Sequence, residues 1–427
     1  MFKSAIKIVK VLYRRVLLSI AFYPVLISFG YCLLAFIILE LESLELAKRF
    51  KEQIPYLFIE DYETARAILT TLIGGILSLT VFSFTMVMVV LSQASSNFSP
   101  RLLPSLVSNK RHQLILGVYI GTLLYCIIIL IVLGANDIET HSVGFSAMLA
   151  AISGVFCTGL FVYFIHSISV SIQIQNIIDN IFRSSSKYLD KDFEDSSSLK
   201  VGLREFKMDD FETINSDKSG YYRGFDDSLL SDSLVGNCHQ FEILPFVGCH
   251  LWEGMPLIRA QNSLSDEDLK NLMLCINISS NRSDQNEGID GFIKLMEIAV
   301  KAMSPGINDP GTAIDAINKL APLFVKILRF PPKTSNSLRD GKIIIVRNNV
   351  MARELLQTII QPIRLYAKKD SSVVIALLGA LKFIARDAKV SKENKEDVKK
   401  ELEALKIDVE GNIENKFDRE KVLAMFE

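Results

Sequence analysis

Four long stretches of the chain contain no Asp, Glu, Lys or Arg and are rich in Leu, Ile, Val and Phe. They lie at about residues 16–39, 67–92, 114–133 and 144–166. Each reaches the length of about 20 residues that a helix needs to cross the hydrocarbon core of a bilayer. The pattern predicts an α-helical integral membrane domain with four transmembrane helices at residues 1–183, the last helix extending to about 182.

Hydroxyl side chains interrupt the second apolar stretch at a step of seven residues, which is about two helical turns, so they lie on nearly one line. Such a line either packs against another membrane helix or borders a wet pathway, and the sequence leaves both interpretations open. His166 is either a helix-end histidine at headgroup level or a titratable gate residue. The candidates for lining a pathway are Thr71, Ser78, Thr85, Ser92, Gln93 and His166.

The third stretch contains Gly117 and Gly121 in the pattern G-x-x-x-G. Small residues at this spacing let two membrane helices approach closely. The pattern predicts a close helix contact, either within one chain or between two chains.

Basic residues indicate how the predicted helices are oriented. Lys and Arg gather before the first stretch, between the second and third, and after Arg183. The positive-inside rule then places both chain ends in the cytoplasm and the loops at 40–66 and 134–143 outside. Lys48, Arg49 and Lys51 in the acidic first loop are discordant with this assignment.

The second half of the chain has the shorter apolar runs and turn residues of a water-soluble domain. The Ser- and acid-rich residues 184–200 predict a linker, and residues 201–262 a small β unit with turns near Gly220, Gly248 and Gly254. Residues 263–427 predict a helical domain with one strand at 342–347. The expected fold class is therefore a four-helix integral membrane domain plus a helix-rich α+β cytosolic domain. Its helices are expected at 265–276, 292–303, 310–329, 349–367, 372–388 and 392–405.

The run SPGINDP at 304–310 is the best candidate site in the predicted soluble domain. Free backbone N–H groups at a helix start attract an anion or a carboxylate. The same residues equally suit a tight helix–helix turn in which Asp309 is the N-cap and Pro310 the first helical residue. The ligand-binding candidates are Arg282, Ser304, Gly306, Asn308 and Asp309.

Composition and motifs argue against several classes of function. The net charge is −1 and the basic residues form no strip with interleaved aromatics, so nucleic-acid binding is not expected. The pairs Cys238-His239 and Cys249-His250 invite a zinc interpretation, but neighbours on a strand point to opposite faces, so no metal or cofactor is expected. No phosphate-binding loop, nucleophile elbow or HExxH motif is present, which disfavours an enzyme.

Several runs together resemble one known family. LSQASSNFSPRLL, LGVYIGTLLY, SGYYRGFD, VGCHLWEGMPL and SPGINDPGTAIDAINKL follow the order and spacing of the bacterial predicted membrane proteins known as domain of unknown function 2254. The resemblance covers roughly residues 65–388. It implies a bacterial inner-membrane protein and carries no specific activity with it.

The chain departs from the pattern of that family at three places. The family usually has an Arg-Thr-x-x-Gln-Asp run where this chain has Arg282, Ser283, Asn286 and Glu287. Ile293 replaces an arginine, and Gly-Cys-His-Leu at 248–251 replaces Gly-Asp-Phe-Val. If these polar groups bind a ligand in relatives, this chain binds it differently or not at all.

Three hypotheses of function follow. The first is a channel- or transporter-like protein whose cytosolic domain binds a regulatory ligand; because four helices make a poor pore, it implies a homo-oligomer. The second is a membrane-anchored sensor or scaffold that binds a small anion or a protein partner. The third and least favoured is an enzyme acting at the bilayer surface.

Overall fold

The computed structural model describes residues 19, 21–42, 59, 61–97, 110–135, 144–198, 212–230, 234, 240–261, 264–280, 287–338 and 343–427. The start of the first predicted span, most of the loop at 40–66, Arg282, Cys238 and His239 lie outside these residues. The chain divides into two compact units, which we call the membrane unit (residues 1–96 and 102–173) and the α+β unit (residues 97–101 and 174–427).

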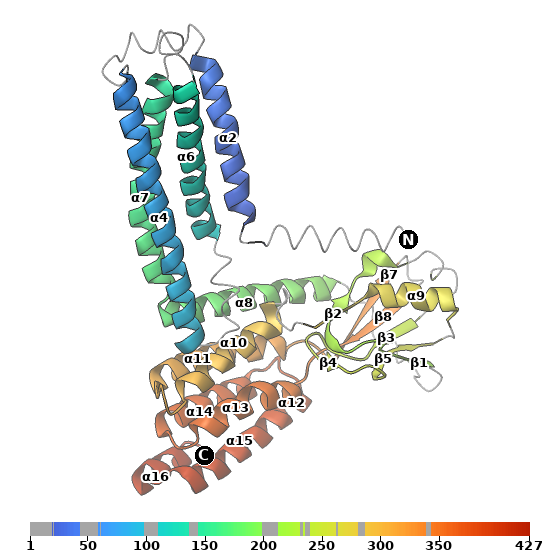
Figure 1. The fold of residues 1–427 in the computed structure, drawn as a ribbon. Coiled ribbons are helices and arrows are strands. Elements are labelled where there is room, and N and C mark those ends of the chain that lie inside the picture. Colours follow the sequence, from blue (N-terminus) through green and yellow to red (C-terminus); the bar gives the residue numbers. More distant parts are fainter. Residues whose placement is uncertain are drawn as a thin grey trace. The chain divides into compact units, whose positions relative to one another are not determined.

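The membrane unit contains four helices: α2 (Phe22–Glu42), α4 (Tyr62–Asn97), α6 (Lys110–Ala135) and α7 (Gly144–Ser171) (Figure 1). All four are long and apolar enough to cross a membrane. Their outer surfaces expose large apolar side chains, among them Val155 and Val162 on α7. Apolar side chains on the outside suit a lipid environment, and the predicted integral membrane domain is confirmed in these elements.

Glycines on α6 allow α2 to pack tightly against it. A Cβ added at Gly117 would lie 2.8 Å from Ile27 Cδ1, and one added at Gly121 would lie 2.7 Å from the Tyr31 ring. Because these contacts are made inside one chain, the structure answers the question that the G-x-x-x-G pattern left open. The two helices run parallel, and their backbones are close where the side chain is absent.

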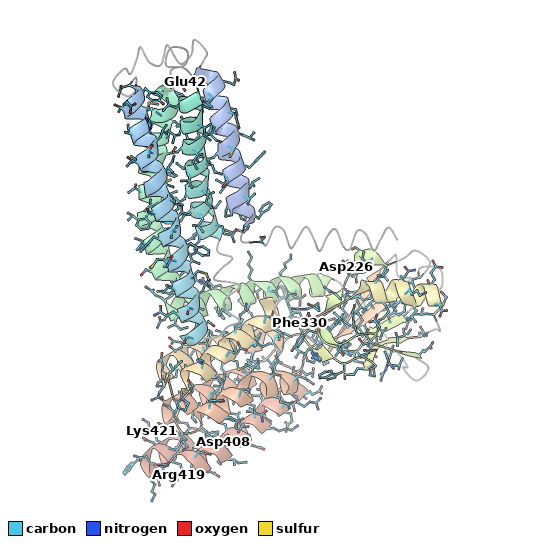
Figure 2. The ribbon with its side chains drawn as sticks, viewed as in Figure 1. Glu42, Asp226, Phe330, Asp408, Arg419 and Lys421 are labelled. Carbon is cyan, nitrogen blue, oxygen red and sulfur yellow. The ribbon has the colours of Figure 1, made fainter. Side chains whose placement is uncertain are left out.

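A carboxylate from one membrane helix caps the start of another. Glu42, labelled at the end of α2 in Figure 2, accepts hydrogen bonds from the backbone N–H of Phe145 at 2.8 Å and of Ser146 at 3.3 Å, and from the Ser146 hydroxyl. These N–H groups lie in the first turn of α7 and have no hydrogen-bond acceptors within their own helix. The negative charge also meets the positive end of the helix dipole, so Glu42 stabilises α7 in two ways.

The α+β unit contains one mixed sheet and one antiparallel sheet, and helices flank them (Figure 1). One sheet has five strands in the order β1-β5-β3-β8-β7, and the other has three in the order β4-β2-β6. Strands β3 and β8 pair in parallel. The strands are β1 (Glu212–Asn215), β2 (Gly220–Phe225), β3 (Gln240–Ile243), β4 (His250–Leu251), β5 (Pro256–Ala260), β6 (Ile276–Ser279), β7 (Lys333–Leu338) and β8 (Ile343–Asn348).

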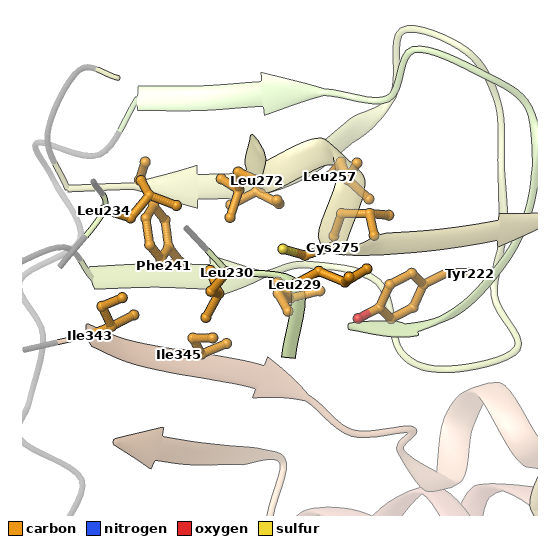
Figure 3. Packing of buried hydrophobic residues seen from close by; sticks show 14 of the residues in the cluster. Tyr222, Leu229, Leu230, Leu234, Phe241, Leu257, Leu272, Cys275, Ile343 and Ile345 are labelled. Atoms are coloured by element: carbon orange, nitrogen blue, oxygen red, sulfur yellow. The ribbon is translucent and has the colours of Figure 1, made fainter. Parts of the chain in front are cut away.

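The helices of this unit lie in layers: α8 packs on α10 and α11, α11 on α14, and α14 on α15. Between the sheets lies an apolar core that includes Tyr222, Phe241 and Ile345 (Figure 3). The helices are α8 (Ile174–Ser198), α9 (Asp266–Cys275), α10 (Glu287–Ala302), α11 (Pro310–Ile327), α12 (Ala352–Leu355), the π-helical turn η5 (Leu356–Ile360), α13 (Gln361–Ala367), α14 (Ser371–Arg386), α15 (Lys392–Asn412) and α16 (Lys416–Ala424).

The predicted helices at 265–276, 310–329, 372–388 and 392–405 correspond to α9, α11, α14 and α15, and the strand at 342–347 to β8. Two caps are as predicted. Ser265 Oγ accepts from the backbone of Asp268 at 3.2 Å, and Asp309 Oδ1 accepts from that of Thr312 at 3.1 Å. Helix α16 follows α15 and was not predicted.

The residues predicted as a linker, 184–200, are helical as far as Ser198. Polar composition suggested a linker, but Ile177, Ile178 and Leu189 are buried at helical spacing, and they fold α8 onto α10 and α11. The predicted extension of the fourth span to 182 is also interrupted, because α7 ends at Ser171 and α8 begins at Ile174. The division between units therefore falls after Gln173 rather than at 183.

The β structure is not confined to residues 201–262. Strand β6 completes the sheet of β2, and β7 and β8 complete the sheet of β3. The pairing of β3 with β8 joins residues about 100 positions apart, such as Phe241 and Ile345. Local patterns carry no signal for such partners, because the partner of a strand is chosen by the core it shares.

We expect Gly121→Ala to destabilise the membrane unit by about 1–3 kcal/mol, because the new methyl group overlaps Tyr31 and forces α2 and α6 apart. The matched control is Gly159→Ala on α7, where a Cβ meets nothing within 4 Å. Thermal unfolding of the two purified variants in detergent measures the difference. Equal melting temperatures for both variants would show that α2 and α6 do not meet at Gly121.

Candidate functional site

A β-bulge in strand β2 directs one arginine away from the regular ladder. Tyr222 pairs with Ile278 and Gly224 with Asn277, so Arg223 is the extra residue between two consecutive pairs. Gly224 has a φ of 123°, a conformation that favours glycine. Bulges re-aim side chains and occur often beside functional sites, and here the side chain that is re-aimed is a cation.

Arg223 is withdrawn from solvent and faces an acid. Its side chain is 5% exposed, and Nη1 lies 4.0 Å from Oδ2 of Asp290, which is 12% exposed. Asp290 belongs to the first turn of α10, whose N-terminal end carries a partial positive charge. The arginine and the helix start thus both contribute positive potential at this position, and the carboxylate of Asp290 balances part of it.

A second arginine lies near the end of β8. Arg347 Nη2 donates to Asp227 Oδ1 at 2.7 Å, and Asp227 begins the short helix η3 (Asp227–Leu229). The Arg347 Nε atom is buried and has no hydrogen-bond partner among the described residues. A guanidinium with one unused donor is suited to bind an acceptor group from a ligand.

Both arginines line a cavity of about 260 Å³ in the α+β unit. Aromatic side chains form much of the remaining wall, including Phe330, which is labelled in Figure 2, and Tyr222. Burial raises the pKa of the Tyr222 hydroxyl, so it stays protonated at neutral pH. The other lining residues are Tyr188, Leu189, Asp192, Gly224, Phe225, Pro245, Phe246, Val247, Gly248, Gly288, Ile289, Asp290, Ile327, Thr334, Asn348, Asn349 and Val350.

The turn at 245–249 and the end of β8 are held in place by hydrogen bonds. Gly248, with a φ of 92°, donates its N–H to the carbonyl of Tyr222 at 2.8 Å. Asn348 Nδ2 donates to the carbonyl of Leu244 at 3.0 Å, and Asn349 Nδ2 to that of Pro331 at 2.7 Å. These bonds fix the backbone on this side of the cavity, so this part of its wall is formed without a ligand.

Helix α8 forms one wall of the cavity through Tyr188, Leu189 and Asp192. It lies close to α10 because that helix has glycines where it faces α8. A Cβ on Gly288 would lie 3.1 Å from the Tyr188 ring, and one on Gly291 would overlap Ser185 Oγ. The position of this wall therefore depends on Gly288 and Gly291, whose lack of side chains lets α8 approach α10.

Ion pairs also join α8 to α11. Lys319 Nζ lies 2.7 Å from Asp179 Oδ1, and Lys326 Nζ lies 2.6 Å from Asp190 Oδ2. The hydrogen bond from Lys319 lowers the pKa of the Asp179 carboxyl, which keeps the pair charged at neutral pH. Because only two residues separate the end of α7 from the start of α8, α8 links the cavity to the membrane unit along the chain.

The predicted ligand-binding residues of the turn at 304–310 are not among those that line the cavity. Asp309 places its own carboxylate at the start of α11, where it accepts from the backbone and the hydroxyl of Thr312. Asn308 has a φ of 47°, and Ser304 Oγ donates to the carbonyl of Lys301 at 2.6 Å. Gly306 is exposed in the same turn. The residues thus form the helix–helix turn, and a ligand there stays a prediction; Arg282 lies outside the described residues.

The predicted pathway residues on α4 lie on the outer face of the membrane unit. Thr71, Ser78 and Thr85 are exposed, and each donates to the carbonyl four residues earlier at 2.8 to 2.9 Å. Ser92, Gln93 and His166 are exposed as well. Within one chain the stripe therefore surrounds no passage, and whether it lines a pathway between chains stays a prediction.

Sequence reasoning missed the two arginines and the cavity. A signal for Arg223 was present in the run SGYYRGFD, because a glycine directly after a strand arginine is typical of a bulge. No such signal exists for Arg347, which is brought to the cavity by the parallel pairing of β8 with β3. Among the described residues, no three His, Cys, Asp or Glu side chains come together as a metal site needs.

Comparison with known proteins agrees with these elements. The family described as "Predicted membrane protein (DUF2254)" matches residues 18–382, which include the four apolar helices and both sheets. The chain belongs to this family. The DUF2254 match ends within α14, so α15 and α16 lie beyond it.

Relatives in the curated sequences are mycobacterial. An uncharacterized protein of Mycobacterium bovis and two of Mycobacterium tuberculosis are each 24% identical to this chain over 336 residues. The match covers 75% of this chain and 62% of each relative, so this DUF2254 chain spans under two thirds of their length. No solved structure matches the chain significantly.

We expect Gly291→Ala to move α8 away from α10 and to lower the stability of the α+β unit by about 1–3 kcal/mol. Removing the opposing side chain in the double variant Gly291→Ala/Ser185→Gly should restore part of this loss. Gly379→Ala on α14, where a Cβ meets nothing within 4 Å, is the control and should be neutral or stabilising. Thermal unfolding of the full chain is the measurement, and an unchanged midpoint for Gly291→Ala would contradict the packing of α8.

Proposed function

We propose that this protein is a ligand-responsive membrane protein of the bacterial inner membrane, whose α+β unit lies in the cytosol and binds a small organic anion. Support for the location comes from the charges that flank the helices. Helix α6 begins with Lys110 and Arg111, whereas α4 begins after Asp61 and has Glu63 in its first turn. The positive-inside rule assigns the first of these ends, and with it the α+β unit, to the cytoplasm.

The observation that carries the proposal is a cavity lined by two arginines and five aromatic rings: Tyr188, Tyr222, Phe225, Phe246 and Phe330. The guanidinium groups favour a carboxylate or phosphate, and the rings favour a flat apolar body. At about 260 Å³ the cavity is at the small end of ligand sites, which favours a metabolite-sized ligand.

Helix α8 gives the bound state a route to the membrane helices. It contributes cavity wall at Tyr188 and Leu189, and its first residue, Ile174, follows the end of α7 by three positions. A ligand that contacts α8 stabilises the position in which this wall is closed. We expect the ligand to act on α7 through this short connection along the chain.

Benzoate and benzamide form a matched pair of probes for this site, since they share a ring and differ in charge. We expect benzoate to raise the melting temperature of the full chain in detergent, by mass action on the folded state, and benzamide to do so far less. Arg347→Gln should weaken benzoate binding at least tenfold by titration calorimetry, because a charge-assisted hydrogen bond is lost.

The control for this variant is Arg353→Gln, whose side chain is 76% exposed and pairs with Glu354 outside the cavity. It should leave benzoate affinity unchanged. Equal binding of benzoate and benzamide, or full benzoate affinity in Arg347→Gln, would contradict the assignment of this cavity to an anion.

A second candidate function is a channel- or transporter-like homo-oligomer, and the exposed hydroxyl stripe of α4 favours it. Thr71, Ser78 and Thr85 share the outer surface with Gly74 and Gly75, at which a Cβ would meet nothing within 4 Å. An outer face of small and hydroxyl residues lets helices of neighbouring copies approach. Copies arranged with these faces inward would line a passage with hydroxyls.

For this candidate we expect the wild-type chain in liposomes to conduct small ions and Ser78→Leu to reduce the flux at least tenfold, because a large apolar side chain replaces a pathway hydroxyl. The control is Val155→Leu on α7, where the side chain is 76% exposed and remains apolar. Native mass spectrometry gives the subunit number. A monomer, or a Ser78→Leu flux equal to that of wild type, would exclude the pathway along α4.

A further inference from the structure

The interior of the membrane unit is less apolar than its outer surface. Seven polar side chains of the four helices are buried there: Ser28, Ser83, His112, Gln113, Thr122, Ser146 and Ser167. A polar group in a bilayer core is costly unless it has a partner or a function. Their positions along α6, the central helix of this interior, show how they are arranged.

Helix α6 carries a polar side chain into the interior at successive levels. His112, Tyr119, Thr122 and Tyr125 are all buried. With a rise of about 1.5 Å per residue, about 20 Å separates the level of His112 from that of Tyr125. This distance is about two thirds of the hydrocarbon thickness of a bilayer, which is about 30 Å.

Both ends of this series have hydrogen-bond partners on α7. At one end His112 Nε2 lies 3.3 Å from Ser167 Oγ. At the other end the Tyr125 hydroxyl donates to the carbonyl of Ser146 at 3.1 Å, and Ser146 also donates to Glu42. Each end therefore combines a titratable side chain, His112 or Glu42, with a serine hydroxyl.

The middle of the series contains buried hydroxyls whose hydrogen bonding is incomplete. Thr122 is satisfied, because Cys157 Sγ lies 3.6 Å from its Oγ1. Ser83 and Tyr119 are 0% exposed and adjacent, yet neither hydroxyl has a well-formed hydrogen bond to any described residue. Ser28 is buried and unpartnered too, and lies at the same level, since its neighbours Ile27 and Tyr31 contact Gly117 and Gly121.

Helix packing alone explains the satisfied pairs but not this middle level. Polar residues that hold membrane helices together do so by hydrogen bonding to each other. A buried hydroxyl without a well-formed hydrogen bond is costly, and Ser83 and Tyr119 lie next to each other here. Two adjacent hydroxyls of this kind are positioned to bind water, which needs two to four polar partners.

We propose that the inner face of α6 forms a proton-conducting track through the membrane unit, made of these side chains and water bound between them. A proton enters at the His112–Ser167 end or the Glu42–Ser146 end. Each O–H or N–H group along the track passes one proton forward, accepts one from behind and then reorients, so no group is consumed and the charge leaves at the opposite end.

The packing of the interior makes the track selective. Tyr119, Phe164 and Ile129 are fully buried in the same interior, and their close packing leaves no bore for a hydrated ion. A proton needs only a chain of hydrogen bonds, whereas other ions need a continuous water-filled opening. This track lies inside one chain, and it is distinct from the exposed α4 stripe and independent of ligand binding in the α+β unit.

The experiment uses the full chain in liposomes that contain the pH-sensitive dye pyranine, with a potassium gradient and valinomycin to drive proton entry. Wild type should acidify the lumen faster than protein-free vesicles. Tyr119→Phe, which removes only a hydroxyl, should lower the rate at least tenfold, and Ser83→Ala should lower it too. The matched control Thr85→Val removes an exposed hydroxyl of α4 and should conduct like wild type.

Melting temperatures of the variants in detergent confirm that each is folded before its rate is compared. A wild-type rate equal to that of protein-free vesicles, or a Tyr119→Phe rate equal to that of wild type, would overturn the track. A rate lowered equally by Thr85→Val would assign conduction to the outer face instead. Benzoate binding is measured on the same preparations, so that failure of the ligand site and failure of the track are seen separately.

Discussion

The need of a polar group to find a partner once it leaves water determines how both units of this protein are built. In the membrane unit the first turn of α7 obtains its partners from Glu42, a residue of another helix. In the α+β unit Arg223, withdrawn from solvent, faces Asp290, and the partly exposed Arg347 pairs with Asp227. Where this requirement is met, the contacts hold elements together. Where it is left unmet, at Arg347 Nε and at Ser83 and Tyr119, we propose that a ligand or water supplies the partner.

In both units, glycines allow two helices to pack closely against each other. Gly117 and Gly121 bring α2 onto α6, and Gly288 and Gly291 bring α8 onto α10. In each case the glycine lies on a helix, where it lowers helix stability by about 1 kcal/mol relative to alanine. The gain is the approach of a neighbouring helix, which in one unit forms the inner packing of the membrane helices and in the other forms a cavity wall.

Helix α8 combines both kinds of contact, polar pairing and close packing against glycines. Its apolar positions dock it on α10 and α11, ion pairs with Lys319 and Lys326 reinforce the docking, and Tyr188 and Leu189 complete the cavity. Its sequence is polar overall, because only one face is buried. Helix α8 begins three positions after the last residue of α7 and also lines the cavity to which we assign the proposed ligand.

Local pattern was sufficient for part of this protein, and the reason is that the relevant forces act between near neighbours. Apolar length specified the four membrane helices, and capping chemistry specified the starts of α9 and α11 at Ser265 and Asp309. Hydrogen bonds within a helix and at its ends join residues a few positions apart, so they can be predicted from the sequence.

Tertiary structure alone decided the rest. Polar composition suggested a linker at 184–200, but the burial of Ile177, Ile178 and Leu189 against distant helices made it α8. Arg223 and Arg347 are more than 100 residues apart in the chain, and they meet one cavity because strand pairing is selected by a shared core. The hydroxyl stripe of α4 was visible in sequence, whereas Tyr119 and Ser83 were not, because periodicity shows which residues share a face and packing alone determines which face is buried.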